Sequence, residues 1–287
     1  MTSLVKIGVF YDGNLFNHLS NYYSYHHRRK QRVSISGLHA FIRHKVAEGE
    51  GVDLRYCQIV DSHYFRGRLS AEEAQTRNLL YFERLFDHIL MSEGVVTHYL
   101  PISGSGEKGI DVWFALEAFE LCVFKRFSVV VLIAVDGDYV PLVRKLNALG
   151  VRVMVLGWDF EFTTEDGKLR ETKTSQKLLN VATYPILMNK IIDDKSLIEA
   201  ELIDNLFVQR RMGTTLLKKA GMQEGKIKAL KEGYGFIKPT DGGPDCFFHW
   251  SDVNEVDFNE LAEAMTVNFR LERTEKGPVA RNVTLAE

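Results

Sequence analysis

The sequence predicts an α/β domain built on a parallel sheet, followed by a small all-β barrel. Up to about residue 190, apolar runs of strand length alternate with longer segments of helical periodicity, which is typical of a three-layer α/β fold. The runs are apolar throughout, as expected of strands that are buried on both faces. From Gly225 on, short strands separated by Gly turns replace this pattern and favour a barrel.

The first domain divides into alternating strands and helices. The expected strands are 6–11, 52–61, 95–100, 128–135 and 151–157. The expected helices are 14–25, 37–47 after a cap at Ser36, 70–91 behind a capping box at Ser70, 109–124, 138–149, 174–193 with a break at Pro185, and 196–211. The polar segment 61–69 is expected to be a loop, and 158–173 a loop or hairpin. These patterns predict boundaries at 1–194 for the first domain, 195–224 for a helical linker and 225–287 for the second domain.

The composition excludes some classes of protein. The chain has 287 residues, a formal net charge of −2, 45% hydrophobic and 26% charged residues, so no overall basic charge indicates a nucleic-acid partner. No apolar segment reaches the length of a membrane span, and the first strand begins too early to leave room for a signal peptide. Cys57, Cys122 and Cys246 are widely spaced in apolar runs, which predicts buried thiols in a reducing cytoplasm.

Acidic side chains follow two of the apolar strands. Strand 128–135 leads into Asp136 and Asp138, and strand 6–11 leads into Asp12 and Asn14. In open parallel sheets, ligands bind beyond the carboxyl ends of the strands, so these side chains are expected to gather around one point. Burying unpaired carboxylates costs free energy, and a divalent cation would offset that cost.

Three segments of the first domain resemble the NYN family of PIN-like metal-dependent ribonucleases. They are Val9-Phe-Tyr-Asp-Gly-Asn14, Lys108-Gly-Ile-Asp111 and Val135-Asp-Gly-Asp-Tyr-Val-Pro-Leu142. The resemblance implies a catalytic site made of Asp12, Asn14, Asp111, Asp136 and Asp138. The four aspartates would bind Mg²⁺ or Mn²⁺ directly or through water, and Asn14 would orient a water or the phosphate. Ala134-Val135 departs from the Ser or Thr-Gly pair of many members.

Other charged residues near these motifs leave two readings open. Glu117 occupies a place where some relatives carry another acid, but it lies about 120° around the helix from Asp111 and fits a solvated residue equally well. Lys108, in a Gly-rich loop, could bind a phosphate or be a mobile surface residue. Arg28 and Arg29, in a basic run, could contact phosphate or lie in a solvated loop.

The second module carries aromatic residues at alternating positions. Alternation places Tyr234 and Phe236 on one face of their strand, and Phe247 and His249 on one face of theirs. On paired strands these rings would form a platform for stacking bases, with Lys226, Lys228 and Lys238 nearby to bind phosphates.

This module resembles the cold-shock domain, an OB-fold that binds single-stranded RNA or DNA. The segments that carry the resemblance are 233–237, 247–250 and 276–283, and they imply a five-stranded OB-type barrel. Ala229 stands where many members have a stacking Trp. Residues 225–287 hold eight Lys and Arg against eleven Asp and Glu, a net charge of −3. We therefore expect this domain to bind a nucleic-acid strand with modest affinity, in an auxiliary role.

The leading functional hypothesis is a metal-dependent endoribonuclease, a hydrolase whose barrel binds single-stranded regions of RNA. Single-stranded DNA is the other possible ligand, and no membrane partner is expected. The alternative is a non-catalytic RNA-binding regulator with a vestigial acidic site. A haloacid-dehalogenase-type phosphatase would need a second Asp where this chain has Asn14.

Overall fold

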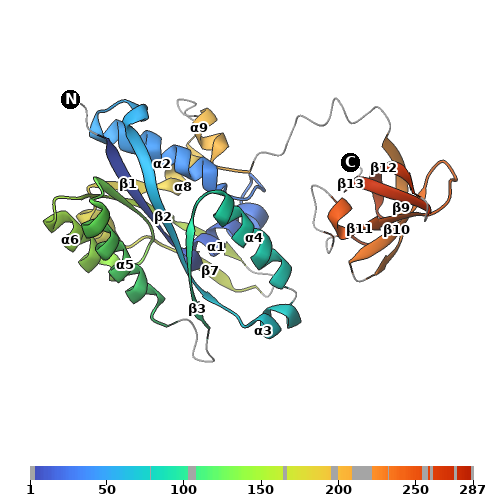
Figure 1. Cartoon of the computed structure of the whole chain (residues 1–287), viewed down its shortest axis with the longest axis horizontal. Coiled ribbons are helices and arrows are strands. Elements are labelled where there is room, and N and C mark those ends of the chain that lie inside the picture. Colours follow the sequence, from blue (N-terminus) through green and yellow to red (C-terminus); the bar gives the residue numbers. More distant parts are fainter. Residues whose placement is uncertain are drawn as a thin grey trace. The chain divides into compact units, whose positions relative to one another are not determined.

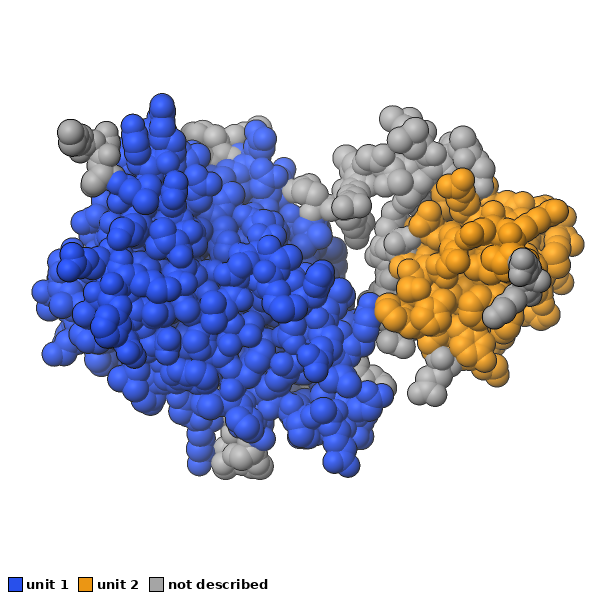
Figure 2. Space-filling view, in the orientation of Figure 1, with its two compact units in different colours: residues 1–208 blue, residues 209–287 orange. Residues whose placement is uncertain are grey.

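The protein folds into two compact units, Met1–Val208 and Gln209–Glu287 (Figure 2). The computed structural model describes residues 4–77, 79–102, 108–163, 167–194, 200–208, 222–231, 233–253, 258, 261–274 and 277–285. None of the described helices has the length and apolar character that a membrane crossing requires.

Unit 1 is built on a six-stranded sheet in which every neighbouring pair runs parallel (Figure 1). From one edge to the other the strands are β3 (Val96–Pro101), β2 (Cys57–Arg68), β1 (Val5–Asp12), β4 (Val129–Ile133), β5 (Arg152–Gly157) and β8 (Tyr184–Leu187). The strand order reverses between β1 and β4, because β1 is followed towards one edge by β2 and β3, and β4 towards the other by β5 and β8. The predicted parallel α/β domain is confirmed.

Helices cover both faces of the sheet (Figure 1). One face packs against α1 (Gly13–Asn21), α2 (Ile35–Glu50), α4 (Leu80–Ser92) and α8 (Met188–Asp193), and the other against α5 (Ile110–Lys125), α6 (Val140–Ala148) and α7 (Gln176–Val181). The side chains of β4 alternate between the two cores and have no solvent exposure. Burying such aliphatic side chains stabilises the fold by about 1.5–3 kcal/mol each, which explains why this strand is apolar throughout.

Short elements complete unit 1. They are a π-helix η1 (Tyr22–His26), the 3₁₀ turns η2 (Leu54–Tyr56) and η3 (Gly137–Tyr139), the helices α3 (Ala71–Thr76) and α9 (Ala200–Asn205), and the hairpin strands β6 (Phe160–Thr163) and β7 (Leu169–Thr172).

The strand expected at 52–61 begins later and runs further than the sequence indicated. β2 covers Cys57–Arg68, so the polar segment expected to be a loop is the second half of a strand. It pairs with β1 on one side and with β3 on the other, and both faces of it are covered by aromatic side chains. Polar residues here pair within the interior: the Nδ1 of His63 lies 2.8 Å from the Nε2 of His98.

Two expected helices are interrupted. The segment 174–193 contains β8, an edge strand that includes Pro185, between α7 and α8. Proline is tolerated there because an edge strand does not need every backbone donor. The segment 70–91 divides into α3 and α4 around residues 77–79. Ser70 caps α3 as predicted, accepting the backbone N–H of Glu73 at 3.2 Å, whereas α2 is capped by Ser34 instead of Ser36.

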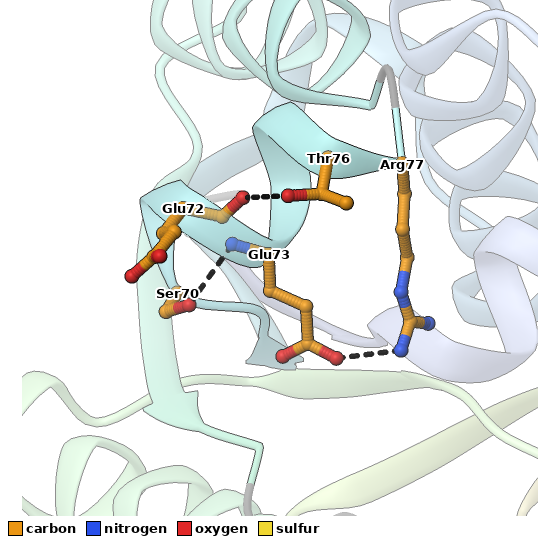
Figure 3. Close-up of a pocket in the computed structure, with 5 residues that line it drawn as sticks. All are labelled: Ser70, Glu72, Glu73, Thr76 and Arg77. Carbon is orange, nitrogen blue, oxygen red and sulfur yellow. Dashed lines mark hydrogen bonds and ion pairs between the residues drawn. The ribbon is translucent and has the colours of Figure 1, made fainter.

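A shallow pocket lies over α3 (Figure 3). It is lined by Ser70, Glu72, Glu73, Thr76 and Arg77. Their contacts are local to this turn: Arg77 pairs with Glu73 at 2.5 Å, and the Thr76 hydroxyl donates to the Glu72 carbonyl at 2.9 Å. These contacts satisfy the helix ends and bring no residue of the predicted site together.

The end of unit 1 includes residues that the sequence assigned to a linker. Residues 200–208 pack on α2: the Ser34 N–H donates to the Leu206 carbonyl, and the Val208 N–H to the Arg32 carbonyl, each at 2.8 Å. Phe207 is 1% exposed. Of the remaining linker, residues 195–199 and 209–221 lie outside the described residues, and 222–224 belong to the first strand of the barrel.

Unit 2 is a closed barrel of five strands, in the order β10-β11-β13-β12-β9. Their bounds are β9 (Met222–Lys231), β10 (Tyr234–Pro239), β11 (Cys246–His249), β12 (Thr266–Thr274) and β13 (Gly277–Leu285). Phe248 and Phe269 fill its interior, and a Cβ at Gly235 would lie 2.6 Å from the Phe248 ring. The predicted five-stranded OB-type barrel is confirmed; Lys276, part of the closing motif, lies outside the described residues.

Close packing of α9 on α2 gives a first prediction. A Cβ at Gly37 would lie 1.7 Å from the carbonyl oxygen of Asn205. Gly37→Ala is therefore expected to displace α9 and to lower the free energy of unfolding of unit 1 by about 1–3 kcal/mol. Urea unfolding and limited proteolysis near residue 205 measure the two effects. Ser36→Ala, an exposed neighbour, should stay within about 0.5 kcal/mol of the parent. Equal stability of both variants would contradict the packing.

Candidate active site and nucleic-acid interface

Asp12 ends β1 and caps α1. Its Oδ1 accepts the backbone N–H groups of Asn14 and Leu15, both at 3.0 Å. Asp is a favoured N-cap because it satisfies N–H groups that the helix leaves unpaired, and the helix dipole favours its negative charge. Between Asp12 and Asn14, Gly13 has no room for a side chain, since a Cβ would lie 2.5 Å from the Phe65 carbonyl oxygen. The carboxylate is therefore fixed at the carboxyl end of the strand.

Asp136 repeats this arrangement after β4. It caps η3, and its Oδ1 accepts the backbone N–H of Asp138 at 2.9 Å. The backbone before it is held by Ser175, whose N–H donates to the Val135 carbonyl at 2.8 Å. β1 and β4 are parallel neighbours with Tyr11 opposite Ile133. Asp12 and Asp136 therefore lie at, or just beyond, the carboxyl ends of these two strands.

Tyr139 links a third carboxylate, that of Asp111, to the segment that carries Asp136. Its hydroxyl donates to the Oδ1 of Asp111, in the first turn of α5, at 2.9 Å. The ring is 2% exposed and contacts Phe114 with ring centroids 4.7 Å apart. Burial and the charges of Asp12, Asp111 and Asp136 raise the pKa of Tyr139 well above its ordinary value. The hydroxyl thus keeps its proton at neutral pH and donates a hydrogen bond to the carboxylate of Asp111, in the field of Asp12 and Asp136.

The other predicted members of the acidic site are placed differently. Asn14 and Asp138 are exposed, as Asp111 and Asp136 also are, but they take part through their backbone N–H groups, which donate to Asp12 and Asp136. Lys108 is exposed two residues before α5, and residues 103–107 of its loop lie outside the described residues. Glu117 is half-buried and accepts the indole N–H of Trp113 at 3.2 Å, so it is neither fully solvated nor hydrogen-bonded to Tyr139.

Arg28 and Arg29 are engaged in ion pairs within unit 1. Arg28 pairs with Asp193 at 3.2 Å, and Arg29 pairs with Asp204 at 2.8 Å. They follow α1 and η1, which lead away from Asp12 over on the order of 20 Å at the helical rise. The structure gives them a role in holding α8 and α9 and does not place them beside the carboxylates.

The donor set suits a hydrated hard cation. Among the described residues, no three His, Cys, Asp or Glu side chains form a ready-made metal cage. Mg²⁺ rarely uses such a cage, because it keeps several waters and binds through one or two carboxylates together with substrate phosphates. Asp12, Asp111 and Asp136 supply carboxylate oxygens of the kind that this cation and Mn²⁺ prefer.

Three aromatic rings meet on the outer surface of the barrel. Phe236 lies opposite Phe247 on paired strands, and Tyr234 lies beside both. The ring centroids are 5.9 Å apart for Phe236 and Phe247, 5.7 Å for Tyr234 and Phe247, and 6.1 Å for Tyr234 and Phe236. His249 lies opposite Tyr234, and its Nδ1 lies 2.9 Å from the Ser251 Oγ, where it caps η6 (Trp250–Asp252). Three of the four rings that the alternation indicated are therefore in mutual contact, whereas the ring of His249 contacts Trp250.

The lysines of the barrel border this surface. Lys226 and Lys238 lie opposite each other on β9 and β10, and both are exposed. Alternation along β10 places Lys238 on the same face as Tyr234 and Phe236. Lys228 is also exposed but forms an ion pair with Asp245. Ala229 lies opposite Phe236, at a position where a larger side chain could contact that ring.

Sequence reasoning missed two residues, Tyr139 and Arg66, that the fold brings to the acidic end of the sheet. Tyr139 lay within a quoted motif, directly after the two acids, and its position before a helix was the available signal. Arg66 follows the residue of β2 that pairs with Asp12. It lay in the segment expected to be a loop, and no local pattern distinguished it.

Family comparisons agree with this geometry. Residues 6–189 match the model of the NYN domain, and residues 223–286 match that of the 'Cold-shock' DNA-binding domain. The chain belongs to the NYN family and carries a C-terminal cold-shock domain. NYN domains are part of a nuclease superfamily, and cold-shock domains bind nucleic acid, so this NYN chain combines a nuclease-family domain with a nucleic-acid-binding domain.

Similar individual proteins were also found. Cold shock protein ScoF of Streptomyces coelicolor is 40% identical over 67 residues, which cover 23% of this chain and 100% of that protein. Cold shock-like protein CspC of Escherichia coli K12 is 43% identical over 63 residues, which cover 21% of this chain and 91% of that protein. A solved Vibrio parahaemolyticus protein of unknown function is 19% identical, covering 66% of this chain and 96% of its own, with a TM-score of 0.43.

The Tyr139 hydroxyl gives a second prediction. In the folded chain its pKa lies far above 10.0, so above pH 10 the unfolded chain releases this proton and the folded chain keeps it. Its contribution to stability is therefore constant below pH 10 and is lost above it, at about 1.4 kcal/mol per pH unit. Tyr139→Phe should cost about 1 kcal/mol at pH 7 and make this alkaline loss shallower.

Urea unfolding at pH 7 and at several values between about pH 10 and 11 measures both effects. Tyr25→Phe is the matched control, because Tyr25 is 52% exposed. An alkaline loss that is equally steep in Tyr139→Phe and in the parent would show that the hydroxyl does not face the carboxylates.

Proposed function

We propose that the chain is a metal-dependent endoribonuclease that hydrolyses RNA phosphodiester bonds in its NYN domain and binds single-stranded RNA through its cold-shock domain. The observation that carries the proposal is that Asp12 and Asp136 lie at the carboxyl ends of two adjacent parallel strands, while Tyr139, three residues after Asp136, donates its hydroxyl to Asp111. A three-carboxylate site beyond the strand ends of a nuclease-family fold suits phosphodiester chemistry, and the barrel supplies a nucleic acid as the substrate.

The carboxylates are held before any substrate arrives. Asp12 and Asp136 each have one oxygen bound by backbone N–H groups, and Asp111 has one bound by Tyr139. Each side chain is thereby oriented, which lowers the cost of assembling the site at the moment of reaction. Bound Mg²⁺ or Mn²⁺ would neutralise charge on the scissile phosphate and lower the pKa of a bound water.

The remaining residues act on water and phosphate. Asn14 is exposed beside Asp12 and can donate its amide to a water or a phosphate oxygen. Exposed Asp138 adds a carboxylate that acts through water, and Lys108 can bind a phosphate oxygen. In the hydrolysis, the water oxygen bonds to phosphorus while the bond to one ester oxygen breaks. The departing oxygen takes a proton, and one strand end keeps the phosphate.

The cold-shock domain binds by stacking. Each base has a π-face, so the rings of Tyr234, Phe236 and Phe247 accept single-stranded RNA with little sequence preference, and single-stranded DNA is a weaker candidate. Lys226 and Lys238 contact the backbone. The three cysteines are buried and free, which suits a reducing compartment such as the cytoplasm.

Cleavage of a labelled RNA tests the proposal. Asp12→Asn, Asp111→Asn and Asp136→Asn should each lower the rate on the order of 100-fold or more, and EDTA should abolish cleavage in the parent. Asn keeps the N-cap at positions 12 and 136, so these variants should remain folded. Asp138→Asn should have a smaller effect.

The matched control is Asp53→Asn, another exposed aspartate that caps a helical turn, at the opposite end of β2. It should cleave at the parental rate. Parental rates in all the variants, or no metal-dependent cleavage by the parent, would overturn the endonuclease. If the parent binds RNA but shows no metal-dependent cleavage, the chain would instead be a non-catalytic RNA-binding regulator.

Base stacking on the barrel gives a separate prediction. Phe236→Ala and Phe247→Ala should each weaken binding of single-stranded RNA by about 1–3 kcal/mol, because each removes a stacking partner. Fluorescence anisotropy with the full chain in EDTA measures this loss without cleavage. Tyr81→Ala, an exposed aromatic on α4, is the control and should bind as the parent does. Equal affinity in all variants would exclude the platform.

A further inference from the structure

The helix α5 is apolar on two opposite faces. The face that is buried against the sheet carries residues four positions apart, which are Ile110, Phe114, Ala118 and Cys122. A second apolar row, called the outer row below, consists of Val112, Leu116, Phe119 and Val123. At the helical repeat the outer row lies about 150° around the helix from the buried face, so it points away from the sheet.

The outer row is exposed. Val112 and Leu116 are each 63% exposed and Val123 is 47% exposed, while Phe119 is half-buried. Phe124, at the end of the row, is 74% exposed. A surface helix normally has one apolar stripe and a polar outer face, and a helix that is apolar all round is normally covered on all sides. The described residues of one chain leave this outer face of α5 in contact with solvent.

The spacing of the outer row is that of a seam between two helices. Its members follow one another at steps of four, three and four residues. Alternating steps of this kind keep apolar side chains on one line, as at the a and d positions of a coiled coil. Ala115 flanks the row with a small side chain, which allows a facing helix to approach closely. The row therefore fits a second helix with the same spacing.

The charges at the two ends of α5 favour an antiparallel partner of the same sequence. Asp111 lies in the first turn, Lys125 lies in the last turn, and Arg126 follows directly and is exposed. An antiparallel pair places the acidic end of each helix beside the basic end of the other, and it also aligns the two helix dipoles favourably. A parallel pair would place like charges side by side.

The exposed area is sufficient for a small dimer interface. At the exposed fractions given above, these aliphatic and aromatic side chains offer on the order of 500 Å² of apolar surface in one chain. Two copies would together bury on the order of 1,000 Å², which is the lower limit for a specific interface. Removal of this apolar surface from water would drive the association.

We propose that the outer row of α5 is the interface of a homodimer, in which two copies of this chain pair their α5 helices in antiparallel orientation. A two-fold axis crosses the middle of the helix pair. Val112 of one copy therefore faces Val123 of the other, and Leu116 faces Phe119.

The dimer goes beyond the proposed function and does not depend on it, because it rests on the apolar row and on the charges at its ends. It has a consequence for the acidic site all the same. Asp111 lies in the first turn of α5, so each end of the helix pair carries one such site. Since α5 has 16 residues, the two sites lie on the order of 20 Å apart along the helices.

The oligomeric state of the full chain tests the interface. Sedimentation equilibrium between about 1 and 100 µM should show a monomer–dimer equilibrium, because an interface of this size is at the weak end of specific association. Leu116→Arg should raise the dissociation constant at least about 30-fold, since the two-fold axis places two like charges in one apolar seam. The position is exposed and arginine is a good helix former, so the variant should remain folded.

Leu85→Arg is the matched control. Leu85 is 40% exposed on α4, which packs on the opposite face of the sheet. The control introduces the same charge at the same residue type and should keep the parental dissociation constant. Urea unfolding of both variants should give the parental stability, which separates lost association from lost folding.

Cross-linking tests the orientation of the two helices. Val112→Cys and Val123→Cys are made as separate variants and mixed, and a short bismaleimide is added. The mixed pair should cross-link much faster than either variant alone, because two 112 positions lie on the order of 16 Å apart along the helices. The three native cysteines are buried, and the parent chain gives the background.

A parent that stays monomeric at about 100 µM would overturn the dimer and leave the outer row to another protein. An association that Leu116→Arg weakens no more than Leu85→Arg does would also overturn it, because the copies would then meet elsewhere. Faster cross-linking within each single variant than in the mixture would contradict the antiparallel pairing.

Discussion

β1 and β4 pair in parallel at the centre of the sheet, with Tyr11 opposite Ile133. The order of the strands reverses at this pair, so the segments that leave the two strands diverge to opposite faces of the sheet. Asp12 and Asp136 cap the helical turns that follow the two strands. α5 packs on one face of the sheet and adds Asp111, which accepts the Tyr139 hydroxyl. The catalysis proposed for unit 1 depends on this pairing, because it alone brings together acids that are more than 120 residues apart.

The sequence was sufficient for features whose cause is local or periodic. Uninterrupted apolar runs predicted central strands, because only strands buried on both faces need no polar residue. Acids directly after such runs predicted that Asp12 and Asp136 lie together at the carboxyl ends of their strands. In the barrel, alternation along two strands was enough to place Phe236 and Phe247 on one surface, since a period of two fixes the face.

Features that depend on distant partners were missed. The second half of β2 is polar in sequence, and only its position between β1 and β3 makes it a strand. Pro185 belongs to a strand because that strand is at the sheet edge. Arg28 and Arg29 looked available for phosphate until their partners, Asp193 and Asp204, were placed beside them. The β6-β7 hairpin stacks on η1 through Phe160 on Tyr22 and Phe162 on His26, which no local pattern encodes.

Tyr139 belongs to the hydrophobic core through its ring and to the carboxylates through its hydroxyl. Its ring contacts Phe114, and Phe114 lies one helical turn after Asp111 on α5. Ala118 and Cys122 continue the same buried stripe. A change of volume at any of these interior positions would tilt α5 and move Asp111 relative to Asp12. Substitutions on the α5 side of the sheet therefore need compensating changes in the residues they contact. The sequence of this core should change more slowly in evolution than that of the core between the sheet and α2.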